Sequence, residues 1–118
     1  MIDRLGTERN AWMCTLRPDG SPHVTPVWFV YLGDTWWVAS ERPNAKLRNI
    51  RADPRVSLHL SDGDAPIVAE GSAVVHRSGY PATVVEAFRQ KYGWNIDTEE
   101  SVLYEVPVSK WLLSGVAQ

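Results

Sequence analysis

The sequence predicts a mostly β protein, a small β-barrel with helices, and three observations support this fold class. Six segments along the chain are rich in β-branched and aromatic residues, as strands usually are. Short turn sequences with glycine, proline or aspartate separate most of these segments. Two further segments carry apolar residues at helical spacing. Mostly antiparallel strands joined by short turns are typical of a small barrel with helices at its ends.

The first third of the chain predicts a meander of three strands. Arg17-Pro18-Asp19-Gly20 is a strong turn sequence, with proline at its second position and glycine at its fourth. Pro22 and Pro26 predict an edge, a bulge or a kink in the strand that follows this turn. The expected elements are a short helix over Ile2–Arg9 and strands over Ala11–Leu16, Pro22–Leu32 and Thr35–Ala39.

The rest of the chain predicts two helices and three strands. Asn44 is suited to cap the first helix, which Pro54 stops, and Gly93 is suited to end the second. The expected elements are a helix over Pro43–Ala52, strands over Arg55–Leu60 and Ile67–His76, a helix over Tyr80–Tyr92, and a strand over Val102–Leu113 interrupted at Pro107. Six strands, several of them apolar, leave edges that a homodimer would cover.

Composition limits the class of protein. A chain of 118 residues with 44% hydrophobic content suffices for a core, so we expect a single domain over residues 1–118. A net charge of −2 argues against a general nucleic-acid binder. The single cysteine, Cys14, cannot form an intramolecular disulfide, which fits a cytoplasmic protein. We also expect no signal peptide and no membrane span, because no long apolar run is present.

The segment Glu41–Arg55 is a candidate phosphate site. It holds five basic residues and two acidic ones, and it runs from a strand end into a helix start. Free backbone N–H groups and a positive dipole end lie at such a start, and Lys46 would add charge in the first turn. On a helix, Lys46, Asn49 and Asp53 share a face. The alternative is a solvated basic helix with no ligand.

The segment Ser21–Tyr31 is a candidate surface for a flat ligand. Pro26 removes a backbone donor and sets the local path, and an irregular strand can present its backbone to a heteroaromatic ring. The alternative is an edge strand that proline protects from aggregation. The sequence also has six tryptophans; core packing and dimer contacts would account for most, while one or two could stack on a planar ligand.

Other chemistries have little support in the sequence. The three histidines lack the close pairing of metal ligands; we assign His59 and His76 structural or surface roles, and leave His23 as a candidate site residue. Cys14 lies within an apolar strand and is expected to be buried and inert. Neither a nucleophile elbow, a Walker loop nor a dinucleotide-binding glycine motif is present.

Three stretches together resemble a known superfamily. TLRPDGSPHVTPVWFVY, WWVASERPNAKLRNIRADPRVSL and AEGSAVV are similar, in this order, to the pyridoxamine 5′-phosphate oxidase-like split β-barrel proteins. Within that superfamily they resemble the flavin/deazaflavin oxidoreductases that use coenzyme F420. The resemblance extends over roughly residues 3–113. It implies a six-stranded antiparallel FMN-binding split barrel that is homodimeric, with two cofactor sites at the subunit interface.

The resemblance also implies positions for the cofactor. Lys46 matches the family's phosphate-binding lysine and Asn49 a nearby polar contact. Asn44 stands where relatives often have an arginine, for which Arg42 could substitute. The cofactor-binding residues implied are Thr25, Pro26, Val27, Trp28, Ala39, Ser40, Arg42, Asn44, Ala45, Lys46 and Asn49.

Three functions follow as hypotheses. The first is an F420-dependent reductase that transfers a hydride to an unsaturated small molecule, with the cofactor carrying the chemistry and His23 or solvent as candidate proton donors. The second is an FMN-binding oxidoreductase on the same barrel. The third is a non-enzymatic carrier of flavin, haem or lipid.

Overall fold

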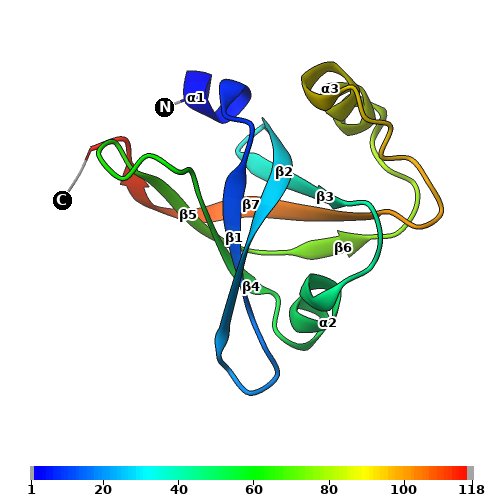
Figure 1. The fold of residues 1–118 in the computed structure, drawn as a ribbon, viewed down its shortest axis with the longest axis horizontal. Helices are drawn as coiled ribbons and strands as arrows, with labels where there is room; N and C mark the ends of the chain where they lie inside the picture. The colour runs from blue at the N-terminus through cyan, green and yellow to red at the C-terminus, as the bar shows by residue number, and fades with distance from the viewer. Residues whose placement is uncertain (1, 117–118) are drawn as a thin grey trace.

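Six antiparallel strands form a closed ring, and a seventh strand and three helices complete the fold (Figure 1). The computed structural model describes residues 2–116. The helices are α1 (Ile2–Thr7), α2 (Ala45–Ala52) and α3 (Ala82–Tyr92). The strands are β1 (Ala11–Leu16), β2 (Pro22–Leu32), β3 (Thr35–Ser40), β4 (Arg55–His59), β5 (Ile67–Ser72), β6 (Val74–His76) and β7 (Val102–Ser114).

The last strand closes the barrel because it pairs with two strands in succession. The sheet runs in the order β3-β2-β1-β4-β5-β7, and β7 returns to β3. The first half of β7 pairs with β3 through Val102–Pro107, and its second half pairs with β5 through Val108–Ser114. The short strand β6 lies along the first half of β7, outside the ring. This arrangement is the split barrel that the sequence predicts.

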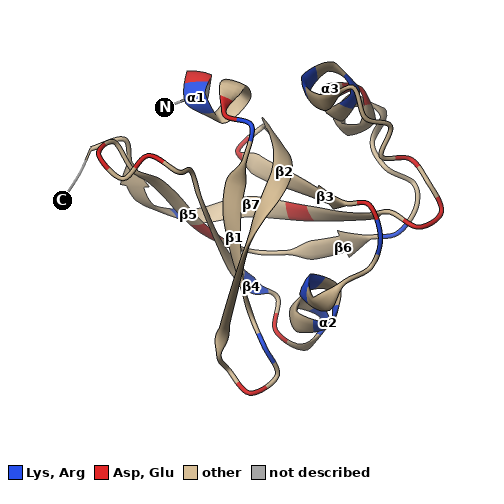
Figure 2. Ribbon diagram, viewed as in Figure 1, with Lys and Arg blue, Asp and Glu red and all other residues tan. Residues whose placement is uncertain are grey.

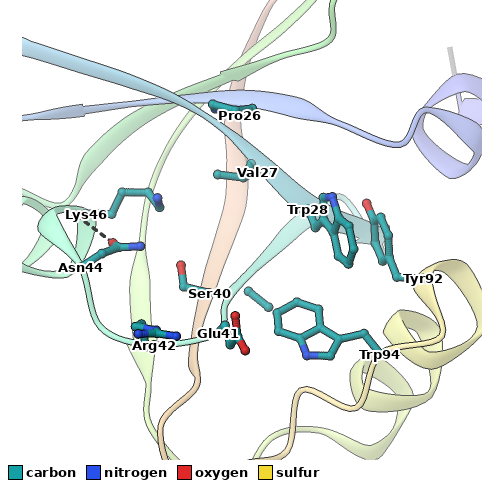
Figure 3. Close-up of a pocket in the computed structure, with 11 residues that line it drawn as sticks. Pro26, Val27, Trp28, Ser40, Glu41, Arg42, Asn44, Lys46, Tyr92 and Trp94 are labelled. Carbon is teal, nitrogen blue, oxygen red and sulfur yellow. Dashed lines mark hydrogen bonds between the residues drawn. The ribbon is translucent and has the colours of Figure 1, made fainter.

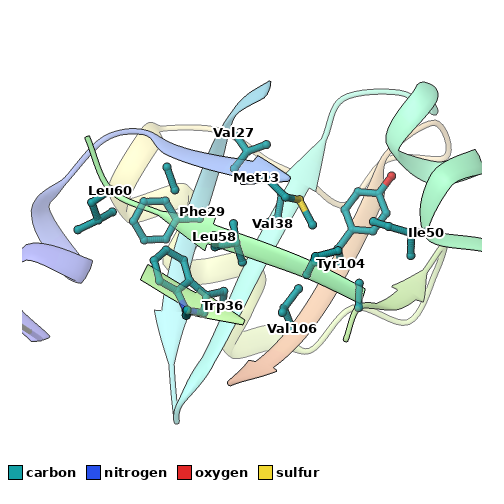
Figure 4. Packing of buried hydrophobic residues seen from close by; sticks show 14 of the residues in the cluster. Met13, Val27, Phe29, Trp36, Val38, Ile50, Leu58, Leu60, Tyr104 and Val106 are labelled. Carbon is teal, nitrogen blue, oxygen red and sulfur yellow. The ribbon is translucent and has the colours of Figure 1, made fainter. Parts of the chain in front are cut away.

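The barrel interior is filled by alternate residues of the strands (Figure 4). On β3, Trp36 and Val38 belong to the interior cluster, whereas Trp37 and Ala39 point to the opposite face. On β7, Tyr104 and Val106 are likewise inside and fully buried. A strand with a side-chain period of two residues sends successive side chains to opposite faces. Both faces of β3 are buried because a second cluster covers its outer face.

The helices cover different parts of the barrel. Leu5 of α1, and Leu47 and Ile50 of α2, pack into the interior cluster. Helix α3 packs on the outer face of the β2–β3–β7 region through Val84 and Phe88. Within residues 2–116, none of the helices is long and apolar enough to cross a membrane.

Most strand boundaries match the prediction to within one residue, and two of the expected strands follow a different course. The expected strand over Ile67–His76 is divided, because after Ser72 the chain stops pairing with β4, and β6 instead pairs with the first half of β7. The expected interruption at Pro107 is wrong: β7 continues through it. Pro107 is the last residue that pairs with β3, opposite Thr35. Proline lacks a backbone N–H, and this residue lies at the point where β7 changes its partner from β3 to β5.

Each helix differs from its predicted bounds by two residues at one end: α1 ends at Thr7 and not at Arg9, and the N-caps account for the starts of α2 and α3. Asn44 caps α2 in an extended conformation, so the helix begins at Ala45 and not at Pro43. Pro81 is the N-cap of α3, so this helix begins at Ala82 and not at Tyr80, and Gly93 ends it in the left-handed conformation (φ +67°), as predicted.

The expectation that Cys14 is buried is wrong. Ala11, Met13 and Thr15 of β1 point into the barrel, so the alternation of the strand places Cys14 on the outer face, where it is partly exposed. An apolar run alone does not tell which of its residues face inward.

Candidate functional site

A cavity of about 650 Å³ opens beside β2, where the end of β3, the β3–α2 segment and the C-terminal end of α3 meet (Figure 3). Its volume lies within the usual range for small-molecule and cofactor sites, about 300–1,000 Å³. The lining residues are Pro26, Val27 and Trp28 of β2, Ala39 and Ser40 of β3, Glu41, Arg42 and Asn44 of the connecting segment, Lys46 of α2, and Tyr92 and Trp94 at the end of α3.

The start of α2 forms the polar end of the cavity. The Asn44 side chain accepts a hydrogen bond from the backbone N–H of Lys46 at 3.1 Å, which caps the helix. Basic residues lie on α2 and on the chain that leads into it (Figure 2). Arg42 lines the same end of the cavity. The positive end of the helix dipole therefore coincides with two cationic side chains.

Lys46 is the most unusual side chain in the cavity. The residue is only 8% exposed, and its ammonium donates a 3.3 Å hydrogen bond to the Thr25 hydroxyl. Among residues 2–116, no carboxylate lies within 4 Å of this ammonium. Burial lowers the pKa of Lys46, since a charge is less stable away from water. A buried cation without a counter-ion facing a cavity is suited to receive an anion.

Aromatic side chains form the other end of the cavity. The rings of Trp28 and Tyr92 stack at 4.4 Å with an interplanar angle of 5°, and Trp94 meets Trp28 edge-on at 5.7 Å. The Arg9 guanidinium lies 4.7 Å from the centre of the Trp28 ring. In Figure 3 these three rings lie on the side of the cavity away from Lys46, so that side is aromatic and largely apolar.

The Tyr92 hydroxyl holds the aromatic wall in place. It accepts a 2.9 Å hydrogen bond from the Phe29 N–H and lies 2.8 Å from the Arg9 carbonyl and 2.9 Å from the Phe29 carbonyl, to one of which it donates. The β1–β2 pairing ends at Val27, so these Phe29 groups have no partner on β1. Burial raises the pKa of Tyr92, so the hydroxyl stays protonated near neutral pH.

One edge of β2 is open beside the cavity. Residues 22–27 pair with β1 on one side, and β3 pairs only with residues 28–32. Within residues 2–116, the other edge of the 22–27 segment has no strand partner. This agrees with the edge position that Pro22 and Pro26 predict. A ligand in the cavity can therefore approach the β2 backbone directly.

The structure brings most of the predicted site residues together. Thr25 does not line the cavity but contacts Lys46 through the hydrogen bond described above. Asn49 is fully buried and donates to the Thr15 hydroxyl at 3.0 Å, away from the cavity lining. Ala45 is exposed in the first turn of α2 and is also outside the lining. Eight predicted residues line the cavity: Pro26, Val27, Trp28, Ala39, Ser40, Arg42, Asn44 and Lys46.

His23, the candidate catalytic residue, also lies outside the cavity lining. Burial lowers its pKa, and so do the neighbouring cations Arg17, Lys46 and Arg48, which favour the neutral imidazole. Within the described part of the chain, no group of three His, Cys, Asp or Glu side chains could hold a metal ion.

Sequence reasoning missed three residues of the cavity, which are Glu41, Tyr92 and Trp94. Glu41 follows the predicted β3 residues directly and could have been included on position alone. Tyr92 lies 63 residues from Phe29, the β2 residue that it contacts, and Trp94 lies two residues further along the chain. The high tryptophan count was the only sequence signal for an aromatic wall. It does not indicate which aromatic side chains come into contact.

Comparison with known proteins identifies the family. The sequence profile of a family described as pyridoxamine 5′-phosphate oxidase matches residues 3–111. The chain belongs to this family. Membership confirms the superfamily that the three sequence stretches resemble. Among curated protein sequences, none matches this family member significantly.

Solved structures with the same fold include proteins of different kinds. An F420 reductase is similar with a TM-score of 0.73 and 22% identity, covering 92% of this chain and 94% of its own. A conserved hypothetical protein from Mycobacterium tuberculosis is similar with a TM-score of 0.75 and 25% identity, covering 93% and 79%. The haem storage protein HutZ from Vibrio cholerae is similar with a TM-score of 0.78 and 17% identity, covering 98% and 94%. Together they show a fold that is shared by proteins with different ligands.

Proposed function

We propose that this protein is an F420-dependent oxidoreductase that transfers a hydride from the reduced deazaflavin to an unsaturated small molecule such as an enone or a quinone. The observation that carries the proposal is the buried ammonium of Lys46, which faces a cavity of about 650 Å³ and has no carboxylate partner within residues 2–116. F420 carries a phosphate in its tail and a flat ring system. The polar end of the cavity at the start of α2 suits the phosphate, and the remainder, which includes the aromatic end, suits the ring.

The residues at the polar end fit a phosphate. Lys46 and Arg42 would supply charge, and the Asn44-capped start of α2 would supply its dipole. Ser40, which also lines the cavity, adds a hydroxyl donor. We assign the phosphate grip to these groups. Asn49, which bonds to Thr15, would act by fixing α2 against β1.

The rest of the cavity fits a planar ring. The open edge of β2 at Thr25–Val27 and the indole of Trp28 would lie against it, and the small side chain of Ala39 leaves room across from them. When bound, reduced F420 supplies a hydride to the acceptor. The residues of the chain orient the two molecules and exclude water from between them.

FMN is the alternative cofactor, because it presents a phosphate and a flat ring to the same groups. The residues that line the cavity suit either cofactor equally. The colour of the purified protein distinguishes them, because tightly held FMN would make it yellow, whereas F420 would have to be added.

A carrier of flavin, haem or lipid is the alternative to an enzyme. The similarity of fold to HutZ supports it. Haem iron is usually held by His, Cys, Met or Tyr. Among the described residues, the cavity lining contains no His, Cys or Met, and the Tyr92 hydroxyl is already held by Phe29 and Arg9. This lining favours a flavin or deazaflavin over haem.

We also propose that residues 1–118 act as one cofactor-binding domain in a cytoplasmic homodimer. Among the described residues, four apolar side chains of the strands are at least 38% exposed: Val24, Leu32, Val74 and Leu112. A second copy could cover part of this surface.

The test of the cofactor site is a titration with F420, FMN, FAD and haem. Lys46→Met keeps an unbranched apolar stem as far as Cε but removes the ammonium and its charge. We expect it to weaken binding of the preferred cofactor by about 1.5–3 kcal/mol, roughly 10- to 150-fold, the range for a charged hydrogen bond. Arg48→Met is the matched control, because Arg48 is exposed on the same helix and does not line the cavity. Unchanged affinity of the Lys46 variant, with folding intact by circular dichroism, would remove Lys46 from the site.

A second assay separates an enzyme from a carrier. Reduced F420 is mixed with the protein and a panel of enones and quinones, and oxidation of F420 is followed by absorbance. Turnover above the protein-free rate supports the oxidoreductase. Tight binding of a cofactor without turnover of any acceptor supports the carrier.

A further inference from the structure

A second cavity lies on another part of the molecule. It has a volume of about 320 Å³ and is formed where α1, β2 and α3 meet. Leu5 of α1, Val30 and Leu32 of β2, and Ala87 of α3 give it apolar walls. It shares no lining residue with the first cavity. Its volume is at the lower end of the range for ligand sites, about 300–1,000 Å³.

Lys91 provides the only cation among the described residues that line this cavity. Its ammonium donates to the Phe29 carbonyl at 3.0 Å and lies 3.8 Å from the centre of the Phe29 ring. Within residues 2–116, no carboxylate lies within 4 Å of it. Burial lowers the pKa of Lys91 to about 8; Glu8 opposes this shift and Arg9 adds to it.

Lys91 has no direct ion pair within residues 2–116, because Glu8 acts on its charge only from beyond 4 Å, and the cavity around it offers mainly apolar contacts. A backbone carbonyl and a ring face satisfy part of the ammonium, but neither neutralises its charge. An anion with an apolar portion would supply a direct charge partner for the Lys91 ammonium and an apolar group to contact the walls of the cavity. The charge-assisted bond would form at Lys91, and the apolar portion would be removed from water by the walls of the cavity.

We propose that the cavity between α1, β2 and α3 binds a small carboxylate with a short apolar tail, its carboxylate paired with Lys91 and its tail against Val30, Leu32 and Ala87. This site is separate from the cofactor cavity and does not rest on the proposed redox function. The two sites meet at one atom, because the Phe29 carbonyl lies within hydrogen-bonding distance of both Lys91 and Tyr92.

The first experiment uses octanoate as the probe and locates it by backbone NMR. We expect octanoate to shift amide signals of Leu5, Val30 and Ala87, and octanol and acetate, which lack the charge or the tail, to bind at least tenfold more weakly. Equal binding of octanol, or shifts confined to residues of the first cavity, would overturn the proposal.

Variants test the two halves of the site by calorimetry. We expect Lys91→Met to weaken octanoate binding at least tenfold, and Lys110→Met, at an exposed position on β7, to leave it unchanged. Ala87→Leu narrows the cavity without touching the charge and is expected to weaken binding as well, which covers the case in which the Lys91 variant fails to fold. Octanoate binding that survives Ala87→Leu in a folded protein counts against the cavity.

Proton uptake gives an independent readout. With a pKa of about 8, Lys91 is about half protonated at pH 8, and a bound carboxylate favours its charged form. We expect about half a proton to be taken up on octanoate binding at pH 8 and almost none at pH 6, measured by calorimetry in buffers of different ionisation enthalpy. Binding with no proton uptake at pH 8 would place the carboxylate away from Lys91.

Discussion

At the scale of the single residue, Asn44 links the stability of a helix to the shape of the candidate site. Its side chain caps α2 by accepting from the Lys46 N–H, and it also lines the cavity. The cap sets where α2 begins, and the beginning of α2 sets where the Lys46 side chain starts. A local hydrogen bond therefore has an effect on the position of a cation in the cavity.

The prediction at this scale concerns Asn44→Ala. Loss of the cap is expected to lower the free energy of unfolding by about 0.5–2 kcal/mol, measured by urea denaturation. Cofactor affinity should fall as well, because the start of α2 is less well held. Asn44→Ser, which can still cap, should retain most of the stability. If Asn44→Ala is as stable as the native protein, the cap does not hold this end of α2.

At the scale of the element, closure of the barrel depends on close contact between β5 and β7. A Cβ atom on Gly71 would lie 2.4 Å from the Pro107 carbonyl oxygen and 2.9 Å from a methyl group of Val106. The register between these strands shifts between Glu70 and Gly71, at the place where β7 changes partner from β3 to β5. Only glycine allows the two backbones to approach this closely at that point.

Gly71→Ala is therefore expected to destabilise the protein by about 1–3 kcal/mol, the usual cost of an added methyl group in a packed interior. Thermal and urea unfolding measure the change. Gly63→Ala is the matched control, because a Cβ at that turn position meets nothing within 4 Å. Equal stability of the two variants would mean that β5 and β7 can separate without cost.

At the scale of the whole molecule, the barrel buries its interior but leaves apolar side chains on its surface. Exposed apolar residues occur on β2, β6 and β7. We predict a particle of twice the 13.3 kDa chain mass by light scattering at micromolar concentration. A particle of single-chain mass that stays the same as the protein is concentrated would contradict the homodimer. The cavity would then be formed by one chain alone.

The fold could be predicted largely from local sequence, and the site only in part. Strand β1 and strand β2 match their predicted bounds because their β-rich runs end at turn sequences that act locally. The division between β5 and β6 could not be predicted, since it depends on which part of β7 lies alongside. The aromatic wall could not be predicted either, because Tyr92 meets Trp28 only after α3 has packed on the barrel.

The sequence by itself determined the strand-rich order of elements, the capped start of α2 and the presence of Lys46 there, because turns, caps and side-chain alternation act over a few residues. The tertiary structure alone decided that Cys14 faces outward, that Trp28, Tyr92 and Trp94 form one wall, and that Lys46 and Lys91 each face a cavity without a carboxylate partner among the described residues. Burial and long-range contacts depend on how distant segments pack together, and no local pattern in the sequence specifies which of these segments meet.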